Sequence, residues 1–398
     1  MKLAATAIAL VLALTAQAAA KSERPTVLGI VWNGDATDIV QLDPLSLKTI
    51  SRRAGVGEPS WFLARSPARQ RAVFAVGPAQ DRLRFLDIRR MRFAGGIRIS
   101  RVQGLLWRDA HRLVLLAAGE RPTVFLVDPV MRRVRLTRAL DGSVTAVARS
   151  ATRLVALLTP KERIGPASLA IIDADGNVRE VSLPSIRAGA ELVDPSSHTF
   201  RAEVPGLAID PVGSRVIVVP AGGSIVEINV DTLQVALHSA KARTLAAQRK
   251  VLEGWSRSAT WFGPHLVAVT GTDSAFVGTS ARMTPAGLTL IDTRDWSART
   301  IEPRATSVAV ADDTLLVCGA VWDPQRKRSE GMGLSGYGPD GTKRFHLFGE
   351  AGVSYVQIVA GYAYLASQNN TRYTIIDPYL GAVVARVSTR ATTTLADG

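Results

Sequence analysis

Residues 124–136 read VFLVDPVMRRVRL, and this stretch decides the fold. An alternating apolar run ends at Asp128 and Pro129, and a second alternating run follows directly. An Asp side chain bonds back to the chain in a turn, and Pro presets the backbone angle that a turn needs. The stretch therefore predicts a β-hairpin in which Asp128 forms the turn.

The same pattern recurs along the chain at intervals of about 40 to 60 residues. A second pair of short strands precedes most copies. Each repeat therefore predicts four strands joined by tight turns, and four such strands form one blade of a propeller. We expect the turn acids to build turns rather than to act as catalytic acids. The eight copies cover residues 39–50, 83–93, 124–136, 169–181, 225–237, 288–301, 334–347 and 373–387.

Both ends of the chain indicate how the ring closes. The first unit lacks an inner strand, and residues 391–395 (ATTTL) resemble the start of one. Pairing the two ends would remove exposed strand edges. We therefore predict an all-β propeller with eight four-stranded blades, closed by pairing of the N- and C-terminal strands. Seven blades are the alternative, if the unit with Tyr337, Gly338 and Pro339 in place of the Asp turn joins a neighbour.

The repeat resembles the YVTN and related lactonase-like β-propeller families. The resemblance lies in residues 124–129, 288–293 and 373–378, which read VFLVDP, LTLIDT and YTIIDP, and it covers nearly the whole mature chain. The tetrapeptide that gives the family its name is absent. Such propellers serve as binding scaffolds, surface proteins and occasional hydrolases, so the resemblance implies architecture more than activity.

The first twenty residues predict export. They combine a single Lys, an apolar stretch and a run of small residues, which is the pattern of a secretory signal peptide. We expect residues 21–398 to be one propeller domain, monomeric, without a membrane anchor, and secreted or periplasmic in a bacterium. Cys318, which stands in an apolar strand pattern, is the only cysteine, so no intrachain disulfide forms and we expect a buried thiol.

The chain is strongly basic, with a formal net charge of +14, and 40 of its 48 basic residues are Arg. Such a charge favours anionic partners, among them an acidic glycan or cell-wall polymer. The alternative is that the excess of Arg reflects only a GC-rich genome, whose codon composition favours Arg at surface positions of any protein. Scattered arginines without long runs predict no specific nucleic acid partner.

Long interruptions of the repeat locate the predicted binding face. Alternate strands of a blade run in opposite directions, so loops from second to third strands and loops between blades emerge on one face. Four long loops belong to this set, and loops of such length tend to be functional. They cover residues 187–204, 238–255, 272–285 and 321–333.

Residues 238–252 have the composition of a helix, which would present a basic edge next to the loop at 321–333. Guanidinium groups beside indoles suit an acidic sugar. We therefore expect a protein, peptide or anionic glycan ligand on this face. The candidate ligand-binding residues are Trp255, Trp322, Arg326, Lys327, Arg328, Arg249 and Lys250.

Catalytic residues are not apparent. The five histidines are scattered, and no two stand at metal-ligand spacing with a carboxylate, so we name no catalytic residue, no cofactor and no zinc site. We expect a binding or scaffold protein rather than an enzyme. The alternative is a lactonase- or lyase-type hydrolase with a divalent metal at the channel mouth, for which the carboxylates on the interruptions are Glu191, Asp194, Asp273 and Asp323.

Overall fold

A computed structural model describes residues 26–50, 54–68, 70–194, 199–242, 254–277, 280–323, 328–367, 370–389 and 393–396. All regular secondary structure in these residues is β-strand, and the strands form seven sheets. The signal peptide predicted at residues 1–20 lies outside the described residues.

Six of the sheets have four strands each. Their strands are β1 (Val27–Asn33), β2 (Ala36–Leu42), β3 (Ala54–Gly55) and β35 (Thr393–Ala396); β4 (Ser60–Arg65), β5 (Arg71–Val76), β6 (Arg82–Asp87) and β7 (Arg92–Arg98); β8 (Val102–Asp109), β9 (Arg112–Ala117), β10 (Thr123–Asp128) and β11 (Arg133–Ala139); β17 (Gly206–Ile209), β18 (Arg215–Val219), β19 (Ile225–Asn229) and β20 (Val235–His238); β27 (Ser307–Ala311), β28 (Thr314–Asp323), β29 (Arg328–Tyr337) and β30 (Lys343–Leu347); and β31 (Gln357–Val359), β32 (Tyr362–Ala366), β33 (Arg372–Asp377) and β34 (Ala382–Ser388).

The seventh sheet has eleven strands. They are β12 (Ser143–Arg149), β13 (Arg153–Thr159), β14 (Gly165–Asp173), β15 (Val178–Asp194), β16 (Thr199–Val204), β21 (Lys241–Ala242), β22 (Gly254–Phe262), β23 (Leu266–Val277), β24 (Ser280–Pro285), β25 (Leu288–Asp292) and β26 (Ser297–Glu302).

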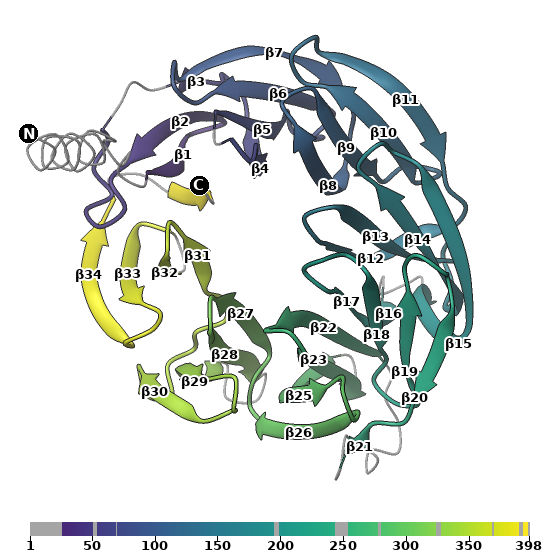
Figure 1. Ribbon diagram of the computed structural model, residues 1–398. Helices are drawn as coiled ribbons and strands as arrows, with labels where there is room; N and C mark the ends of the chain where they lie inside the picture. Colours follow the sequence, from purple (N-terminus) through teal and green to yellow (C-terminus); the bar gives the residue numbers. More distant parts are fainter. Residues whose placement is uncertain are drawn as a thin grey trace, which may run out of the picture.

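The sheets stand side by side in a ring (Figure 1). Strands such as β8, β12 and β27 lie toward the centre, and strands such as β7, β11 and β34 lie at the outside. Within each four-stranded sheet, neighbouring strands pair antiparallel. The protein is therefore an all-β propeller, as its repeat predicts.

The prediction of eight blades is wrong, and so is the alternative of seven, because the structure has six blades. Six blades are separate four-stranded sheets, and the rest of the ring is the eleven-stranded sheet. In that sheet two four-stranded runs, β12 to β15 and β22-β23-β25-β26, are joined through β16, which pairs with β15 on one side and β22 on the other. Within the predicted loop at 187–204, residues 187–194 and 199–204 instead continue the sheet as strands, so two predicted units share one sheet.

The predicted pairing between the two ends of the chain is present. Strand β35 pairs antiparallel with β1, from Leu28 opposite Ala396 to Val31 opposite Thr393. The Leu395 side chain is buried, and its carbonyl accepts a hydrogen bond of 2.8 Å from Nε2 of Gln357 in the last sheet. The first sheet is thus completed by the last strand, although none of the seven sheets closes on itself.

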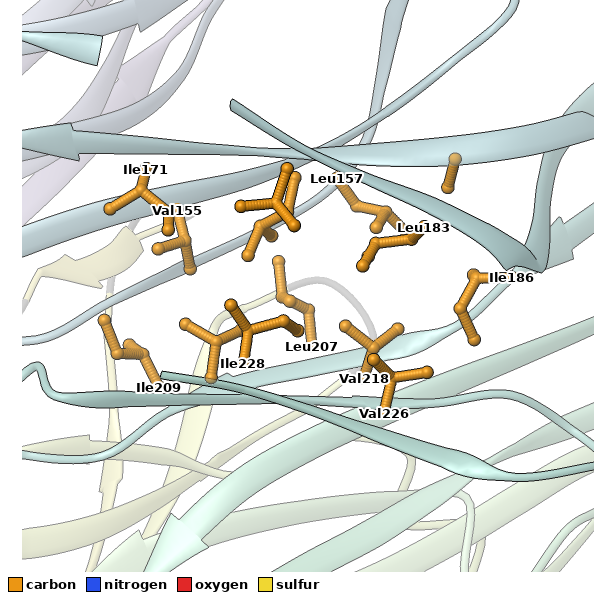
Figure 2. Packing of buried hydrophobic residues seen from close by; sticks show 14 of the residues in the cluster. Val155, Leu157, Ile171, Leu183, Ile186, Leu207, Ile209, Val218, Val226 and Ile228 are labelled. Carbon is orange, nitrogen blue, oxygen red and sulfur yellow. The ribbon is translucent and has the colours of Figure 1, made fainter. Parts of the chain in front are cut away.

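The hydrophobic core consists of separate clusters, each of which lies between two neighbouring runs of strands. One cluster joins β13, β14 and β15 to β17, β18 and β19, and Figure 2 shows Leu157, Ile171 and Leu183 facing Leu207, Val218 and Ile228. The remaining clusters of the described chain are built in the same way, and one of them packs the last sheet against the first through Tyr373 and Leu42. Each blade thus needs its neighbours to bury its faces.

The turn acids have the predicted role. Oδ1 of Asp128 accepts the backbone N–H groups of Val130 and Met131, each at 3.0 Å. Burial alone would raise the pKa of Asp128, but these bonds and the Arg135 guanidinium lower it to about 2. The other turn acids that accept backbone N–H groups in this way are Asp43, Asp87, Asp173, Asp292 and Asp377.

Buried single residues follow their predictions. Cys318 is fully buried, and burial raises the pKa of its thiol to about 11. Trp107 and Trp261 are buried between neighbouring sheets, and Trp61 contacts Trp32 edge to face at 6.0 Å between ring centroids. These three tryptophans pack between blades.

Candidate functional site

The predicted binding loops are largely regular hairpins. Residues 187–194 form the end of β15 and residues 199–204 form β16. Residues 272–277 form the end of β23 and residues 280–285 form β24. Residues 321–323 end β28, and residues 328–333 begin β29. The helix predicted at 238–252 is wrong at its start, where His238 ends β20 and Lys241 and Ala242 form β21. Residues 243–253 lie outside the described chain.

The three hairpins emerge on one face of the ring. Strands β23 and β28 are second strands of their runs, and β15 is a fourth strand, so all three run toward the same face in an antiparallel meander. Strand β16 pairs in parallel with β22, with Glu203 opposite Trp255, and β24 contacts β28. We call these three hairpins, β15–β16, β23–β24 and β28–β29, the hairpin face.

A first set of charges fixes the β15–β16 hairpin. Nη2 of Arg201 bonds Oε1 of Glu203 at 2.6 Å, and Nη1 of Arg201 lies 3.8 Å from Oε1 of Glu191, which stands directly opposite on β15. Glu203 is buried, and so is the Nε atom of Arg201, which has no hydrogen-bond partner. One guanidinium therefore holds two carboxylates beside the start of β22.

A buried ion pair lies on the neighbouring strands. Nη2 of Arg257 bonds Oδ1 of Asp273 at 2.7 Å, and both side chains are almost fully buried. Nη1 of Arg257 donates to the carbonyl oxygens of Ser256 and Thr272, and its guanidinium lies 5.9 Å from the ring centroid of Trp255. Since most donors of this arginine have partners, it locks the base of the β23–β24 hairpin in one arrangement.

Glycines allow the strands to approach here. Gly271 has φ +149°, and a Cβ at this position would lie 2.0 Å from the backbone oxygen of Ser256. A Cβ at Gly254 would lie 2.7 Å from Oγ of Ser274 and 3.1 Å from the oxygen of Ala202. Side chains at these positions would separate β22 from its two neighbours.

A cavity of about 470 Å³ lies beneath this part of the hairpin face. The inner strands β12, β17 and β22 line it, so it belongs to the central channel. Its side chains include Arg149, Arg257, Ser258, Thr260 and Trp261, together with apolar residues, and no Asp or Glu. Arg257 therefore connects the hairpin face to the channel.

Three of the sequence-predicted site residues come together. Trp255, Glu191 and Asp273 all stand in the continuous run β15-β16-β22-β23-β24. Trp322, Asp323, Asp194 and Arg328 are placed in hairpin strands, although their side chains lie outside what the structure describes. Arg249, Lys250, Arg326 and Lys327 lie outside the described residues altogether.

Sequence reasoning missed the arginines that organise this cluster. Arg201 and Arg257 each neutralise a carboxylate that the sequence suggested as a metal ligand, Glu191 and Asp273 respectively. The available signal was the polar run Ser256, Arg257 and Ser258 in an inner strand, where other units are mainly apolar. Within the described residues no group of three or more His, Cys, Asp and Glu side chains is placed to hold a metal ion.

The hairpin face also presents apolar side chains to solvent. Leu192 near the end of β15 is 45% exposed, and Met283 on β24 is 47% exposed. Both side chains lie on hairpins whose bases are fixed by Arg201 and Arg257. The arrangement is suited to recognition, because its charged groups already hold one another.

Among the residues that the structure describes, there is no helix that is long and apolar enough to cross a membrane. No protein-family model and no curated protein sequence matches the chain.

Solved structures with a similar backbone are nevertheless numerous. The dihydro-heme d1 dehydrogenase NirN, in complex with DHE, has 13% identity over 94% of this chain and 75% of its own, with a TM-score of 0.59. Apo AztD from Citrobacter koseri has 11% identity over 94% of this chain and 99% of its own, with a TM-score of 0.58. The computationally designed protein Ika8 has 12% identity, covers 84% and 88% of the two chains, and has a TM-score of 0.50. At these identities the likeness establishes a β-propeller fold.

Proposed function

We propose that this protein is an exported binding or scaffold protein that holds a protein or peptide partner on the hairpin face. The observation that carries the proposal is the rigid base of that face. Two arginines, Arg201 and Arg257, pair with carboxylates across neighbouring strands, and Leu192 and Met283 stand exposed on the same hairpins. A surface ordered in advance loses less entropy when it binds a partner.

Apolar side chains favour a protein partner over a glycan on this face. Anchors that fill a partner's pockets are apolar or aromatic, and the charges around them set orientation. The carboxylates Glu203 and Asp273 are each already paired with an arginine, so they favour a recognition role over metal-dependent hydrolysis. The residues at 1–20 support a secreted or periplasmic location.

Site-specific photo-crosslinking in the producing cells tests the proposal. A photoreactive residue at Leu192 or Met283 should give the same crosslinked partner, because both positions lie on one face. Val212 is the matched control, since it is 77% exposed and lies in the turn between β17 and β18, on the opposite face. The same adduct from Val212, or different adducts from Leu192 and Met283, would contradict a partner held on the hairpin face.

A second variant separates contact from folding. Changing Leu192→Asp and Met283→Asp together should abolish the adduct formed from a third hairpin position, Ala190, while thermal unfolding stays within about 1 °C of the wild type, because both side chains are exposed. Retention of the adduct would show that these apolar side chains do not carry binding.

A further inference from the structure

The positive charge of the chain is concentrated in two neighbouring sheets, away from the hairpin face's own strands. Residues 82–138 contain fourteen Arg, no Lys and four acidic residues, a net charge of +10 out of +14 for the whole chain. This stretch covers β6 and β7 of one sheet and β8 to β11 of the next. A compositional excess of Arg would be spread over the ring, so the concentration calls for a local explanation.

Many of these arginines lie together on the outside of the ring. Strands β7 and β11 are the outer strands of their sheets, and they are neighbours in the ring (Figure 1). Nη1 of Arg132 donates to the carbonyl oxygen of Ala94 at 2.6 Å and so links the two outer edges. Two exposed arginines of this region have partners, Arg132 with Ala94 and Arg135 with Asp128. We call the other exposed arginines of these strands and of the turns before them the arginine rim: Arg89, Arg90, Arg92, Arg98, Arg133 and Arg138.

The arginine rim lacks the neutralising partners that other arginines of the same sheets have. Arg135 pairs with Asp128, Arg112 with Asp109, and Arg121 with Asp141. The six rim arginines have no ion pair with any residue in the described parts of the chain. Like charges held close together raise the free energy of the folded protein, and an anion that spans them would lower it.

A cavity marks the end of the arginine rim that lies toward the hairpin face. Its volume is about 570 Å³, and Arg98, Ser100, Arg121 and Phe125 are among its lining residues. Asp81 also lines it, 3.7 Å from Nε of Arg82. Guanidinium and hydroxyl donors beside an aromatic side chain suit a sugar ring that carries a carboxylate or sulfate.

Protection of strand edges does not explain the arginine rim. Charged side chains on an outer strand do prevent sheets from joining edge to edge. The outer strand β20, however, has no arginine and exposes Val235 and Leu237, and β34 has only Arg386 and exposes Val383 and Val384. Other blades of this ring therefore keep their edges without such a charge.

The surroundings favour an acidic polysaccharide over nucleic acid. Single-stranded nucleic acid is bound by exposed aromatic side chains on which bases stack, and among residues 82–138 no Phe, Tyr or Trp is exposed, Phe93 being covered by Arg84 at 4.4 Å. Double-stranded DNA is usually read by a helix or ribbon that enters a groove, and the arginine rim lies on the edges of two sheets. A flexible chain of acidic sugars needs only a row of guanidinium groups.

We propose that the arginine rim is a second binding surface, separate from the hairpin face, for an acidic polysaccharide. The polymer lies along the outside of β7 and β11, and one of its acidic sugars occupies the cavity lined by Arg98. Guanidinium groups bind carboxylates or sulfates through paired hydrogen bonds, and the affinity depends on salt concentration because bound counterions are released.

Fluorescence anisotropy with a labelled polygalacturonate oligosaccharide tests the proposal. The rim variant carries Arg89→Gln, Arg90→Gln, Arg133→Gln and Arg138→Gln. The control variant carries Arg163→Gln, Arg187→Gln, Arg372→Gln and Arg386→Gln, which removes the same charge from exposed arginines elsewhere. We expect the rim variant to bind roughly 30-fold more weakly and with a smaller salt dependence, and the control to change by less than about threefold.

Two outcomes overturn the proposal. If both variants lose affinity equally, binding follows net charge and no surface is specific. If double-stranded DNA of equal charge binds the wild-type chain more tightly than polygalacturonate and is equally sensitive to the rim variant, the partner is nucleic acid. Arginine labelling by phenylglyoxal provides a readout on the wild-type chain, in which polygalacturonate should protect Arg89, Arg90 and Arg133 but not Arg372 or Arg386.

Discussion

Removal of the Asp273 carboxylate should destabilise the fold through the charge that it leaves behind. In the variant Asp273→Ala, Arg257 keeps its bonds to the carbonyl oxygens of Ser256 and Thr272. It loses the one carboxylate that pairs with it among the described residues, in a position that is 5% exposed. An unpaired buried charge costs about 3 to 5 kcal/mol, and the two remaining hydrogen bonds place this case near 3 kcal/mol. The unfolding entropy of about 2.1 cal/mol/K per residue makes that a fall in Tm of about 4 °C for a chain of 398 residues.

Differential scanning calorimetry at pH 7 measures this fall, with Glu350→Ala as the matched control. Glu350 lies 3.8 Å from Arg304, and its side chain is 88% exposed, so its removal should lower Tm by less than about 1 °C. The double variant Arg257→Leu with Asp273→Leu should recover most of the loss, because it removes the stranded charge. A Tm for Asp273→Ala within 1 °C of the wild type would refute the reasoning.

Three further perturbations test the fold. Gly271→Ala should lower Tm more than Gly263→Ala. A Cβ at position 271 would lie 2.0 Å from the backbone oxygen of Ser256, whereas no atom lies within 4 Å of a Cβ at position 263. Equal falls in Tm, measured by calorimetry, would refute this. Asp128→Asn should lower the free energy of unfolding at pH 7, whereas near pH 2 the variant and the wild type should be almost equally stable. The reason is that a carboxylate with its pKa lowered to about 2 stabilises the fold above about pH 4 and loses that effect as the pH falls through 2. The same difference between the urea midpoints of the two proteins at both pH values would contradict this. Cys318 should react with a thiol reagent at pH 8 only after unfolding, because burial raises the pKa of its thiol to about 11, and fast reaction of the native protein would be inconsistent with its burial.

The fold was largely predictable because its signal is local. A turn acid such as Asp43 or Asp377 follows an alternating strand within a few residues, so the pattern can be read without knowing which strands meet. The joining of two predicted blades was not predictable in this way. It depends on β16 pairing with β22, and the two paired residues Glu203 and Trp255 are separated in sequence by the whole four-stranded sheet β17 to β20, so no local pattern signals the pairing.

The candidate site could be predicted only in part, for the same reason. The interruptions of the repeat predict Trp255, Glu191 and Asp273 as site residues. Their arginine partners are not predicted, because Arg201 and Arg257 acquire a role only through cross-strand register. The arginine rim is not evident from the sequence, since its two groups, residues 89–98 and 133–138, meet only when β7 and β11 become neighbours.

The pairing of β35 with β1 has a consequence for the order in which the protein is made. Strand β1 is made before the other described strands, yet its inner neighbour β35 follows all of them. A nascent chain can stack its blades one after another but cannot complete its first sheet until β35 has been synthesised. Completion of that sheet therefore reports that the polypeptide from β1 to β35 has been delivered, and a chain truncated before Thr393 would keep an open strand edge available to chaperones or to other unfinished copies.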